Sequence, residues 1–204
     1  MSDPLLFVGL ANPGLEYEGT RHNVGAEVVR RLASEGGAEF RRAPRRMRAL
    51  VAAADLPGGR TVLALPSVFM NESGRAVAPL LRYYKVPEDR LVLVHDDIDL
   101  PFGKLRFHFG RGTGGHNGVA SVVAALGSVA LWRLKVGVGR PPGRMDPAAF
   151  VLRRFSRPER PDVDLMVAEA AGVLRAFAAA GGETARQHAG DATARLGIGE
   201  AEPR

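Results

Sequence analysis

Short apolar segments alternate along the chain with longer segments whose apolar residues recur at helical spacing. The first apolar segment, Leu5–Gly9, predicts a buried strand. After a glycine-punctuated turn, the segment Asn23–Gly36 places Val24, Val28 and Leu32 on one side of a helix and ends at a glycine. The chain is therefore predicted to open with a strand, a turn and a helix.

The same alternation continues towards the C-terminus. Met47–Leu56 and Arg60–Pro66 predict two strands joined by a Pro-Gly-Gly turn, which indicates a hairpin. Further strands are predicted over Arg90–Pro101, Gly103–Phe109 and Trp132–Pro141, and further helices over Asn71–Val86, Asn117–Gly127 and about Pro158–Ala189. Strands alternating with helices, with a hairpin among them, favour a single-domain three-layer α/β/α sandwich with a mixed central sheet.

A length of 204 residues suffices for one domain with a substantial core. We expect a single domain over residues 1–190 and a flexible tail over residues 191–204. The longest largely apolar run, Val119–Trp132, is shorter than the about 20 residues that a membrane-spanning helix needs. The first residues lack the basic and apolar regions of a secretory signal. A cytosolic protein without a membrane segment is therefore expected.

Composition adds a preference for anionic partners. The formal net charge is +6 and the isoelectric point is about 10.4, which favours an anionic partner, most commonly nucleic acid. Arginine supplies most of the excess; it suits phosphate recognition, although a biased base composition would also produce it. The basic run Arg41–Arg48 is either a phosphate-binding segment or a solvated loop. The absence of cysteine excludes disulfides, thiolate zinc sites and a cysteine nucleophile.

All four asparagines of the chain stand at junctions between predicted elements. These are Asn12, Asn23, Asn71 and Asn117. Asparagine is a favoured helix cap and turn residue, so each one alone has a structural explanation, and for Asn23 that explanation suffices. However, the loops that leave the carboxyl ends of parallel strands converge on one crevice. Asn12, Asp96 and Asn117 all follow predicted strands, which would bring them to that crevice.

The buried strand that begins at Arg90 ends in three acidic residues. Asp96, Asp97 and Asp99 are consistent with a metal site, with a carboxylate that orients a histidine, or with an acidic turn. Neighbouring residues of a strand point to opposite faces, which separates Asp96 from Asp97. The acidic turn fits Asp97 and Asp99 better than it fits Asp96.

Among the five histidines, His22 is the best candidate for a general base. An unperturbed imidazole has a pKa of about 6.5, so its neutral form can take a proton from water. Such a base needs a partner that orients it through the other ring nitrogen, and the predicted sheet favours Asp96. His116 precedes a helix and is predicted to contact substrate or to cap that helix. His95 and His188 are predicted to be structural.

Gly110, Gly112 and Gly115 match the G-x-G-x-x-G pattern of dinucleotide-binding loops, and they stand between a strand and a helix as that pattern requires. A nicotinamide-dependent oxidoreductase nevertheless ranks last, because no acidic residue follows about 20 positions later to hold the ribose. That region instead contains Arg133, Lys135 and Arg140. What remains is a loop whose free N–H groups suit a polar or anionic group.

Five segments follow one another between Val8 and Pro141: "VGLANPGLEYEGTRHNVG", "PSVFMNESGRAV", "VHDDIDLPFGKLRF", "GTGGHNG" and "RLKVGVGRP". In order and approximate spacing they closely resemble bacterial peptidyl-tRNA hydrolase. The set is highly specific, because the resemblance does not depend on any one motif. The C-terminal helical region of the family is compatible with the rest of the chain.

The resemblance implies a cytoplasmic, monomeric enzyme without metal or cofactor, whose catalytic domain covers residues 1–190. It would hydrolyse the ester between a peptide and the terminal ribose of tRNA, with peptidyl-tRNA as its partner. The family's catalytic base, orienting carboxylate and one positioning amide match His22, Asp96 and Asn12. Its substrate-binding positions match Tyr17, Met70, Asn71, Asn117, His116, His108 and Lys135.

The sequence departs from the family at two of these positions. The family commonly clamps the 5′-phosphate of tRNA with a lysine and an arginine, where this chain has His108 and Lys135. Lysine keeps the charge of arginine but not its two-pronged geometry. Arg106, Arg111 and Arg133 lie close by in sequence and are candidates for compensation. The alternative from another class, a non-catalytic RNA-binding module, would use the basic surface without turnover.

Overall fold

The computed structural model describes residues 3–44, 47–127 and 130–198. Their strands form one seven-stranded sheet in the order β2-β3-β4-β1-β5-β7-β6. The strands are β1 Leu5–Gly9, β2 Arg41–Arg42, β3 Ala49–Leu56, β4 Gly59–Pro66, β5 Leu91–Asp97, β6 Leu105–Gly110 and β7 Leu131–Gly137. The α-helices are α1 Val24–Glu35, α2 Gly74–Tyr84, α3 Asn117–Leu126, α4 Pro147–Val151, α5 Arg160–Ala180 and α6 Gly182–Leu196. Four short 3₁₀ helices complete the description: η1 Leu15–Tyr17, η2 Arg21–Asn23, η4 Met70–Glu72 and η5 Glu88–Arg90.

The sheet is mixed, as predicted. The central strands β4, β1, β5 and β7 are parallel neighbours, whereas β2, β3 and β6 run antiparallel to the strands beside them. Each of the five residues of β1 is buried, because helices cover both faces of the sheet at its centre. Strand β6 lies at an edge and shows the alternating exposure that its sequence predicted.

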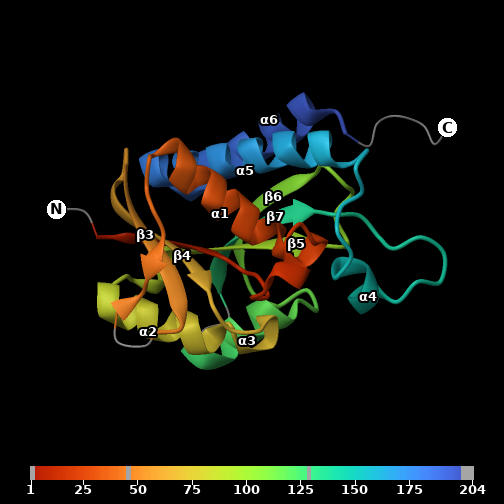
Figure 1. Ribbon diagram of the computed structural model, residues 1–204. Helices are drawn as coiled ribbons and strands as arrows, with labels where there is room; N and C mark the ends of the chain where they lie inside the picture. The colour runs from red at the N-terminus through yellow and green to blue at the C-terminus, as the bar shows by residue number, and fades with distance from the viewer. Residues whose placement is uncertain (1–2, 45–46, 128–129, 199–204) are drawn as a thin grey trace.

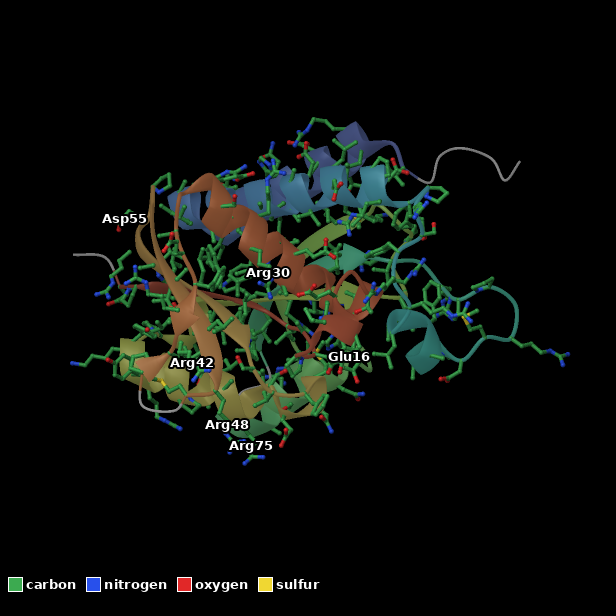
Figure 2. All side chains as sticks on the ribbon, viewed as in Figure 1. Glu16, Arg30, Arg42, Arg48, Asp55 and Arg75 are labelled. Atoms are coloured by element: carbon green, nitrogen blue, oxygen red, sulfur yellow. The ribbon has the colours of Figure 1, made fainter. Side chains whose placement is uncertain are left out.

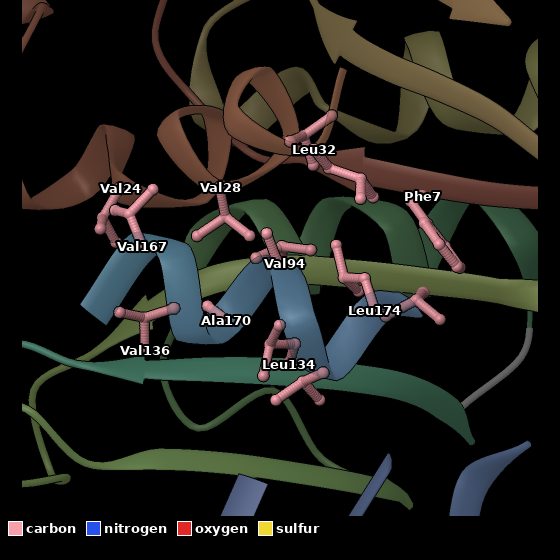
Figure 3. Packing of buried hydrophobic residues seen from close by; sticks show 14 of the residues in the cluster. Phe7, Val24, Val28, Leu32, Val94, Leu134, Val136, Val167, Ala170 and Leu174 are labelled. Atoms are coloured by element: carbon pink, nitrogen blue, oxygen red, sulfur yellow. The ribbon is translucent and has the colours of Figure 1, made fainter. Parts of the chain in front are cut away.

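Two apolar layers hold the helices on the sheet, with α1, α5 and α6 on one side of it and α2 and α3 on the other (Figure 1). One layer packs α1, α5 and α6 against one face and includes Phe7, Val28 and Leu174. Figure 3 shows these side chains interdigitating between the helices and the strands. The other layer packs α2 and α3 against the opposite face through residues such as Leu6 and Val77. The three-layer α/β/α sandwich is therefore confirmed.

Some boundaries differ from the prediction. The C-terminal helical region divides at Gly181 into α5 and α6, and α4 was not predicted. Helix α6 continues to Leu196, through the expected start of the tail at residue 191. Residues 199–204 lie outside the described part, so the flexibility of the tail stays a prediction.

The basic run Arg41–Arg48 lies at the sheet edge. Arg42 and Arg48, both labelled in Figure 2, are exposed, while residues 45 and 46 of the run lie outside the described residues. Both alternatives, a phosphate-binding segment and a solvated loop, require this exposure, so the role of the run stays a prediction. Among the described helices, none is long and apolar enough to cross a membrane.

Candidate active site

A pocket of about 800 Å³ opens at the carboxyl ends of the central parallel strands, where loops from both helical layers meet. Seven of the candidate residues line it: Asn12, His22, Met70, Asn71, Asp96, His116 and Asn117. Asn12 follows β1, Asp96 belongs to β5, and the others lie in η2, in η4 or at the start of α3. The predicted convergence of strand ends therefore places these side chains around one cavity.

His22 reaches the sheet because α1 packs unusually close to it. A Cβ atom added at Gly25 would overlap the carbonyl oxygen of Val94 in β5, and one added at Gly9 would overlap the backbone of Gly25. Because both residues are glycines, the helix and the strands can touch through their backbones. The turn η2, which directly precedes α1, is thereby held against the end of β5.

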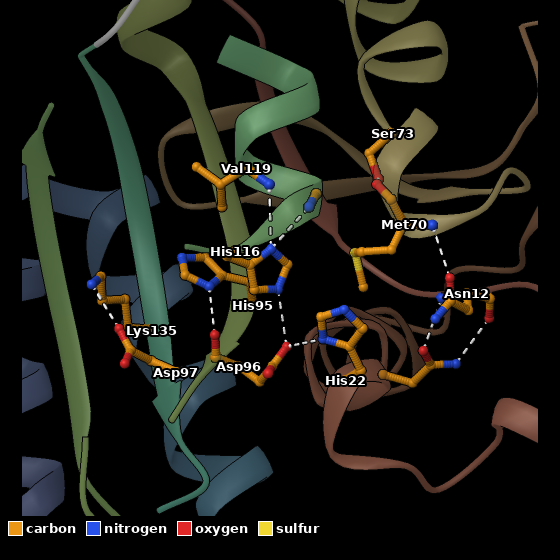
Figure 4. Close-up of polar contacts among 12 residues, drawn as sticks. Asn12, His22, Met70, Ser73, His95, Asp96, Asp97, His116, Val119 and Lys135 are labelled. Carbon is orange, nitrogen blue, oxygen red and sulfur yellow. Dashed lines mark hydrogen bonds and ion pairs between the residues drawn. The ribbon is translucent and has the colours of Figure 1, made fainter. Parts of the chain in front are cut away.

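His22 and Asp96 form the central pair of the pocket (Figure 4). His22 Nδ1 lies 2.8 Å from Asp96 Oδ1, and both side chains are buried. Burial raises the pKa of the Asp96 carboxyl, but the hydrogen bonds from His116 and then from His22 outweigh it and hold the pKa well below its usual range. The ionised carboxylate accepts a hydrogen bond from Nδ1–H, so the neutral ring of His22 keeps Nε2 as its basic nitrogen.

His116 contacts the same carboxylate oxygen from the other side. Its Nε2 lies 3.0 Å from Asp96 Oδ1, while its Nδ1 accepts from the backbone N–H groups of Gly118 and Val119. Of the two predicted roles, helix capping is therefore confirmed. The expectation of free N–H groups at this helix start is wrong for Gly118 and Val119, because the His116 ring already occupies them.

Asn12 is held by three hydrogen bonds. Asn23 accepts from its backbone N–H at 2.8 Å and donates to its carbonyl oxygen at 2.9 Å. The Asn12 side-chain oxygen accepts from the Met70 N–H at 2.8 Å. The capping role predicted for Asn23 is wrong, since its side chain makes no cap hydrogen bond in α1 and turns towards Asn12 instead. With its oxygen engaged, the Asn12 amide is fixed in orientation and presents its NH₂ group as a donor.

The remaining substrate candidates lie farther out. Asn71 and Asn117 are exposed and line the pocket mouth. Tyr17 is half-buried and packs edge-on against Phe69, with ring centroids 6.3 Å apart, and Phe69 lines the pocket. Tyr17 therefore packs against a residue of the pocket wall, and its contact with substrate stays a prediction.

The acidic turn is confirmed for Asp97. Asp97 Oδ1 accepts from the Asp99 N–H at 2.8 Å, and its Oδ2 forms an ion pair with Lys135 Nζ at 2.7 Å. Lys135, one of the two expected phosphate contacts, is therefore engaged within the protein, and it does not line the pocket.

The other expected phosphate contact, His108, is uncharged near neutrality. Burial and then the neighbouring Arg133 lower the pKa of His108 to about 4. Arg133 itself is buried and donates to the carbonyl groups of Gly110, Arg111 and Gly112. Its proposed compensation for the missing clamp charge is therefore wrong: this guanidinium holds the glycine-rich loop. Arg106 and Arg111 are exposed.

Metal binding was one interpretation of the acidic cluster. Within the described part of the chain, ligand atoms of His22, Asp96 and His116 all lie within 4.8 Å of one another. A metal would need lone pairs on His22 Nδ1 and His116 Nε2, yet hydrogen bonding places protons on both nitrogens. The geometry fits a hydrogen-bonded carboxylate better than a metal centre.

Buried His95 lies beneath this cluster. Its Nδ1–H donates to the Asp96 carbonyl oxygen at 2.7 Å, and its ring packs on that of His116. Burial, and then His116, hold the pKa of His95 well below its ordinary value, so the ring stays neutral. The structural role predicted for His95 fits these contacts.

Sequence reasoning missed Arg21, which joins the candidate site to the C-terminal region. Its guanidinium lies over the rings of Phe150 and Phe155, pairs with Glu159 at 2.6 Å and donates to the carbonyl oxygen of Arg154. These contacts fix α4, whose residues form one wall of the pocket. The partners lie about 130 residues away, so no local pattern could reveal them.

Replacing Arg21 with alanine is expected to reduce the free energy of unfolding by about 2–3 kcal/mol, because a buried cation and its stacking partners are lost together. Urea unfolding of the variant measures the change. Arg30→Ala, at an exposed position of α1, is the matched control and should unfold like the parent chain. Equal midpoints for all three proteins would contradict the structural role.

Comparison with known proteins extends over nearly the whole chain. The family model of peptidyl-tRNA hydrolase matches residues 6–197. The peptidyl-tRNA hydrolase of Mycobacterium ulcerans is 49% identical over 186 residues, which cover 91% of this chain and 97% of that protein. The Mycobacterium tuberculosis protein is 48% identical with the same coverage. The crystal structure of peptidyl-tRNA hydrolase from Acinetobacter baumannii superposes with a TM-score of 0.80 at 29% identity, covering 93% of this chain and 95% of that one.

Proposed function

This chain belongs to the peptidyl-tRNA hydrolase family, and we propose that it hydrolyses the ester between peptide and tRNA in peptidyl-tRNAs released from the ribosome, recycling the tRNA. One observation carries the mechanism: the 2.8 Å hydrogen bond between His22 and Asp96, in a pocket that three asparagines also line. A base with an orienting carboxylate is the minimum needed to activate a water molecule.

In the proposed reaction, His22 Nε2 takes a proton from water, and the resulting hydroxide attacks the ester carbonyl carbon. Asp96 stabilises the imidazolium that forms. The tetrahedral intermediate then collapses, the bond to the ribose oxygen breaks, and the imidazolium returns its proton to that oxygen. The hydroxide of the water molecule thus becomes part of the peptide carboxyl group, and its proton becomes part of the ribose hydroxyl. No covalent enzyme intermediate is required.

The asparagines supply the polar contacts of this proposal. The fixed Asn12 amide donates to the negative charge that develops on the carbonyl oxygen, an interaction often worth about 3 kcal/mol when it is preorganised. Asn71 and Asn117 position the peptide and the water. Neutral amides can bind the peptide backbone without distinguishing its side chains, which suits an enzyme that accepts many peptides.

The apolar part of the pocket receives the peptide. Met70, Ile98 and Val151 line it together with exposed Phe69 and Leu152. We assign substrate contact to Met70 and to Tyr17, which packs against Phe69. The enzyme is proposed to act in the cytoplasm as a monomer, without metal or cofactor, on peptidyl-tRNA.

An assay with purified protein and an N-blocked aminoacyl-tRNA tests the proposed function. We expect release of the blocked amino acid and of intact tRNA, with the same rate after treatment with a chelator. Salt-sensitive tRNA binding without turnover would identify a non-catalytic RNA-binding module instead. Loss of turnover with chelator would contradict the metal-free mechanism.

Replacing His108 with lysine is expected to strengthen binding to tRNA that carries a 5′-phosphate, because the parent residue is neutral above about pH 4. One added phosphate contact should steepen the dependence of log K on log salt by about one. Binding titrations at several salt concentrations, with and without the 5′-phosphate, measure this slope. His108→Gln adds no charge and serves as the control; equal slopes for the lysine variant and the parent chain would place the phosphate elsewhere.

A further inference from the structure

Two histidines donate to a single carboxylate oxygen in the candidate site. Asp96 Oδ1 lies 2.8 Å from His22 Nδ1 and 3.0 Å from His116 Nε2, and Figure 4 shows the two rings approaching it from different sides. The ring centroids of His22 and His116 are 4.8 Å apart. The proposed reaction uses only His22 and Asp96, which leaves the buried contact of His116 without a chemical role.

The protonation of His116 is determined by the helix that it caps. Its Nδ1 accepts hydrogen bonds from Gly118 N–H at 3.1 Å and Val119 N–H at 3.3 Å, so this nitrogen cannot carry a proton. The single ring proton therefore resides on Nε2 and points at Asp96. Protonating Nδ1 would place an N–H group against two other N–H groups at the positive end of α3, which disfavours the charged ring.

We propose that His116 is a positioning residue that lowers the basicity of His22 by sharing the oxygen of Asp96 with it. The inference rests on the proposed function, in which His22 is the base. A carboxylate oxygen that already accepts one hydrogen bond attracts a second proton less strongly. Donation from His116 therefore reduces the stabilisation of the His22 imidazolium, and a larger fraction of His22 is neutral at a given pH.

The other charged groups around His22 have partners of their own, so replacing His116 does not remove any of their interactions. From β5, Asp97 pairs with Lys135; from α4, the cap residue Asp146 accepts from Ala149. From α1, Glu27 pairs with Arg160, and within η2 Arg21 pairs with Glu159. Glu72 from η4 also lines the pocket and pairs with Arg75. His95 from β5 contacts His116 and Asp96 but stays neutral. A substitution of His116 that preserves the helix cap therefore isolates the bond to Asp96.

Asparagine at position 116 keeps the helix cap and removes the hydrogen bond to Asp96. Its side-chain oxygen can accept from the first N–H groups of α3, as asparagine does at helix starts, but it is too short to donate to Asp96 as well. In His116→Asn, we expect His22 to titrate about one pH unit higher than in the parent chain. NMR titration of the histidine Cε1–H signals measures this shift without substrate. His188→Asn makes the same substitution on α6, and His22 should titrate there as in the parent.

Kinetics give a second measure of the same shift. The acidic limb of the kcat/KM profile should move to higher pH in His116→Asn by about the same amount. An unchanged His22 titration in a folded variant would overturn the proposal. So would a raised KM with an unmoved acidic limb, because that pattern indicates direct substrate contact.

The parent protein provides a test that does not depend on any variant folding. Nitrogen-15 shifts of the His116 ring should report a proton on Nε2 and none on Nδ1. A ring protonated at Nδ1 would overturn the inference. These NMR measurements need no turnover and are therefore independent of the hydrolysis assay. An inactive parent chain in that assay would overturn the proposed function but not the hydrogen-bond arrangement that NMR measures.

Discussion

Replacing His22 with alanine is expected to lower kcat/KM about a thousandfold while leaving tRNA affinity nearly unchanged. The size of the loss follows from the contribution of a positioned general base, about 10²–10⁴-fold. Binding should persist because the cationic surface and the amide groups remain. Hydrolysis of an N-blocked aminoacyl-tRNA, together with a direct binding titration, measures both quantities.

A matched control and a rescue experiment sharpen this expectation. His188→Ala removes a histidine of α6, away from the pocket, and should hydrolyse at the parent rate. Added imidazole should restore part of the activity of His22→Ala, because a small base can enter the vacated space. Full activity in His22→Ala would refute the assignment of the base.

Replacing Asp96 with asparagine is expected to reduce kcat about a hundredfold or more. The amide can still accept a hydrogen bond from His22, but it carries no charge to stabilise the imidazolium. The basicity of His22 should fall, so the acidic limb of the rate profile should move to lower pH, opposite to the shift expected for His116→Asn. Asp99→Asn, at an exposed position of the same loop, is the control. A shift in the same direction for Asp96→Asn and His116→Asn would contradict the shared-oxygen geometry.

Asp96 should also contribute to stability in a pH-dependent manner. Its pKa in the folded chain lies well below that of the unfolded chain, about 3.9. The contribution is therefore complete above about pH 4 and declines as the pH falls towards the folded value. Denaturant unfolding should show a larger loss of stability below pH 4 for the parent chain than for Asp96→Asn, in which Glu159 and Glu169, whose pKa values are also lowered, still titrate.

The fold and the central pair of the site were predictable because they depend on periodic patterns. Alternating strands and helices indicated the sandwich, and loops that leave parallel strands share one edge of a sheet. Asn12, Asp96 and Asn117 follow predicted strands, so their convergence followed from topology, and His22 lies in the same connection as Asn12. The division at Gly181 and the short helix α4 were missed, since neither has a distinctive apolar period.

The hydrogen-bond partners within the site were not predictable. Asn23 occupies a helix-start position and would be expected to cap, yet it binds the backbone of Asn12. Lys135 appeared available for phosphate but pairs with Asp97. Each outcome depends on distances of a few tenths of an ångström between loops that are far apart in sequence. Residue type and order do not contain that information.

The close contact between α1 and the sheet has a consequence for how this chain can diverge. Gly25 has no side chain with which to touch substrate, yet one added methyl group would push η2 away from β5. The first effect of this displacement would be a longer distance between His22 Nδ1 and Asp96 Oδ1. A mutational scan should therefore find that position 25 tolerates substitution as poorly as His22 does. Tolerance to substitution then depends on the spacing of the backbones as much as on the chemical groups that react.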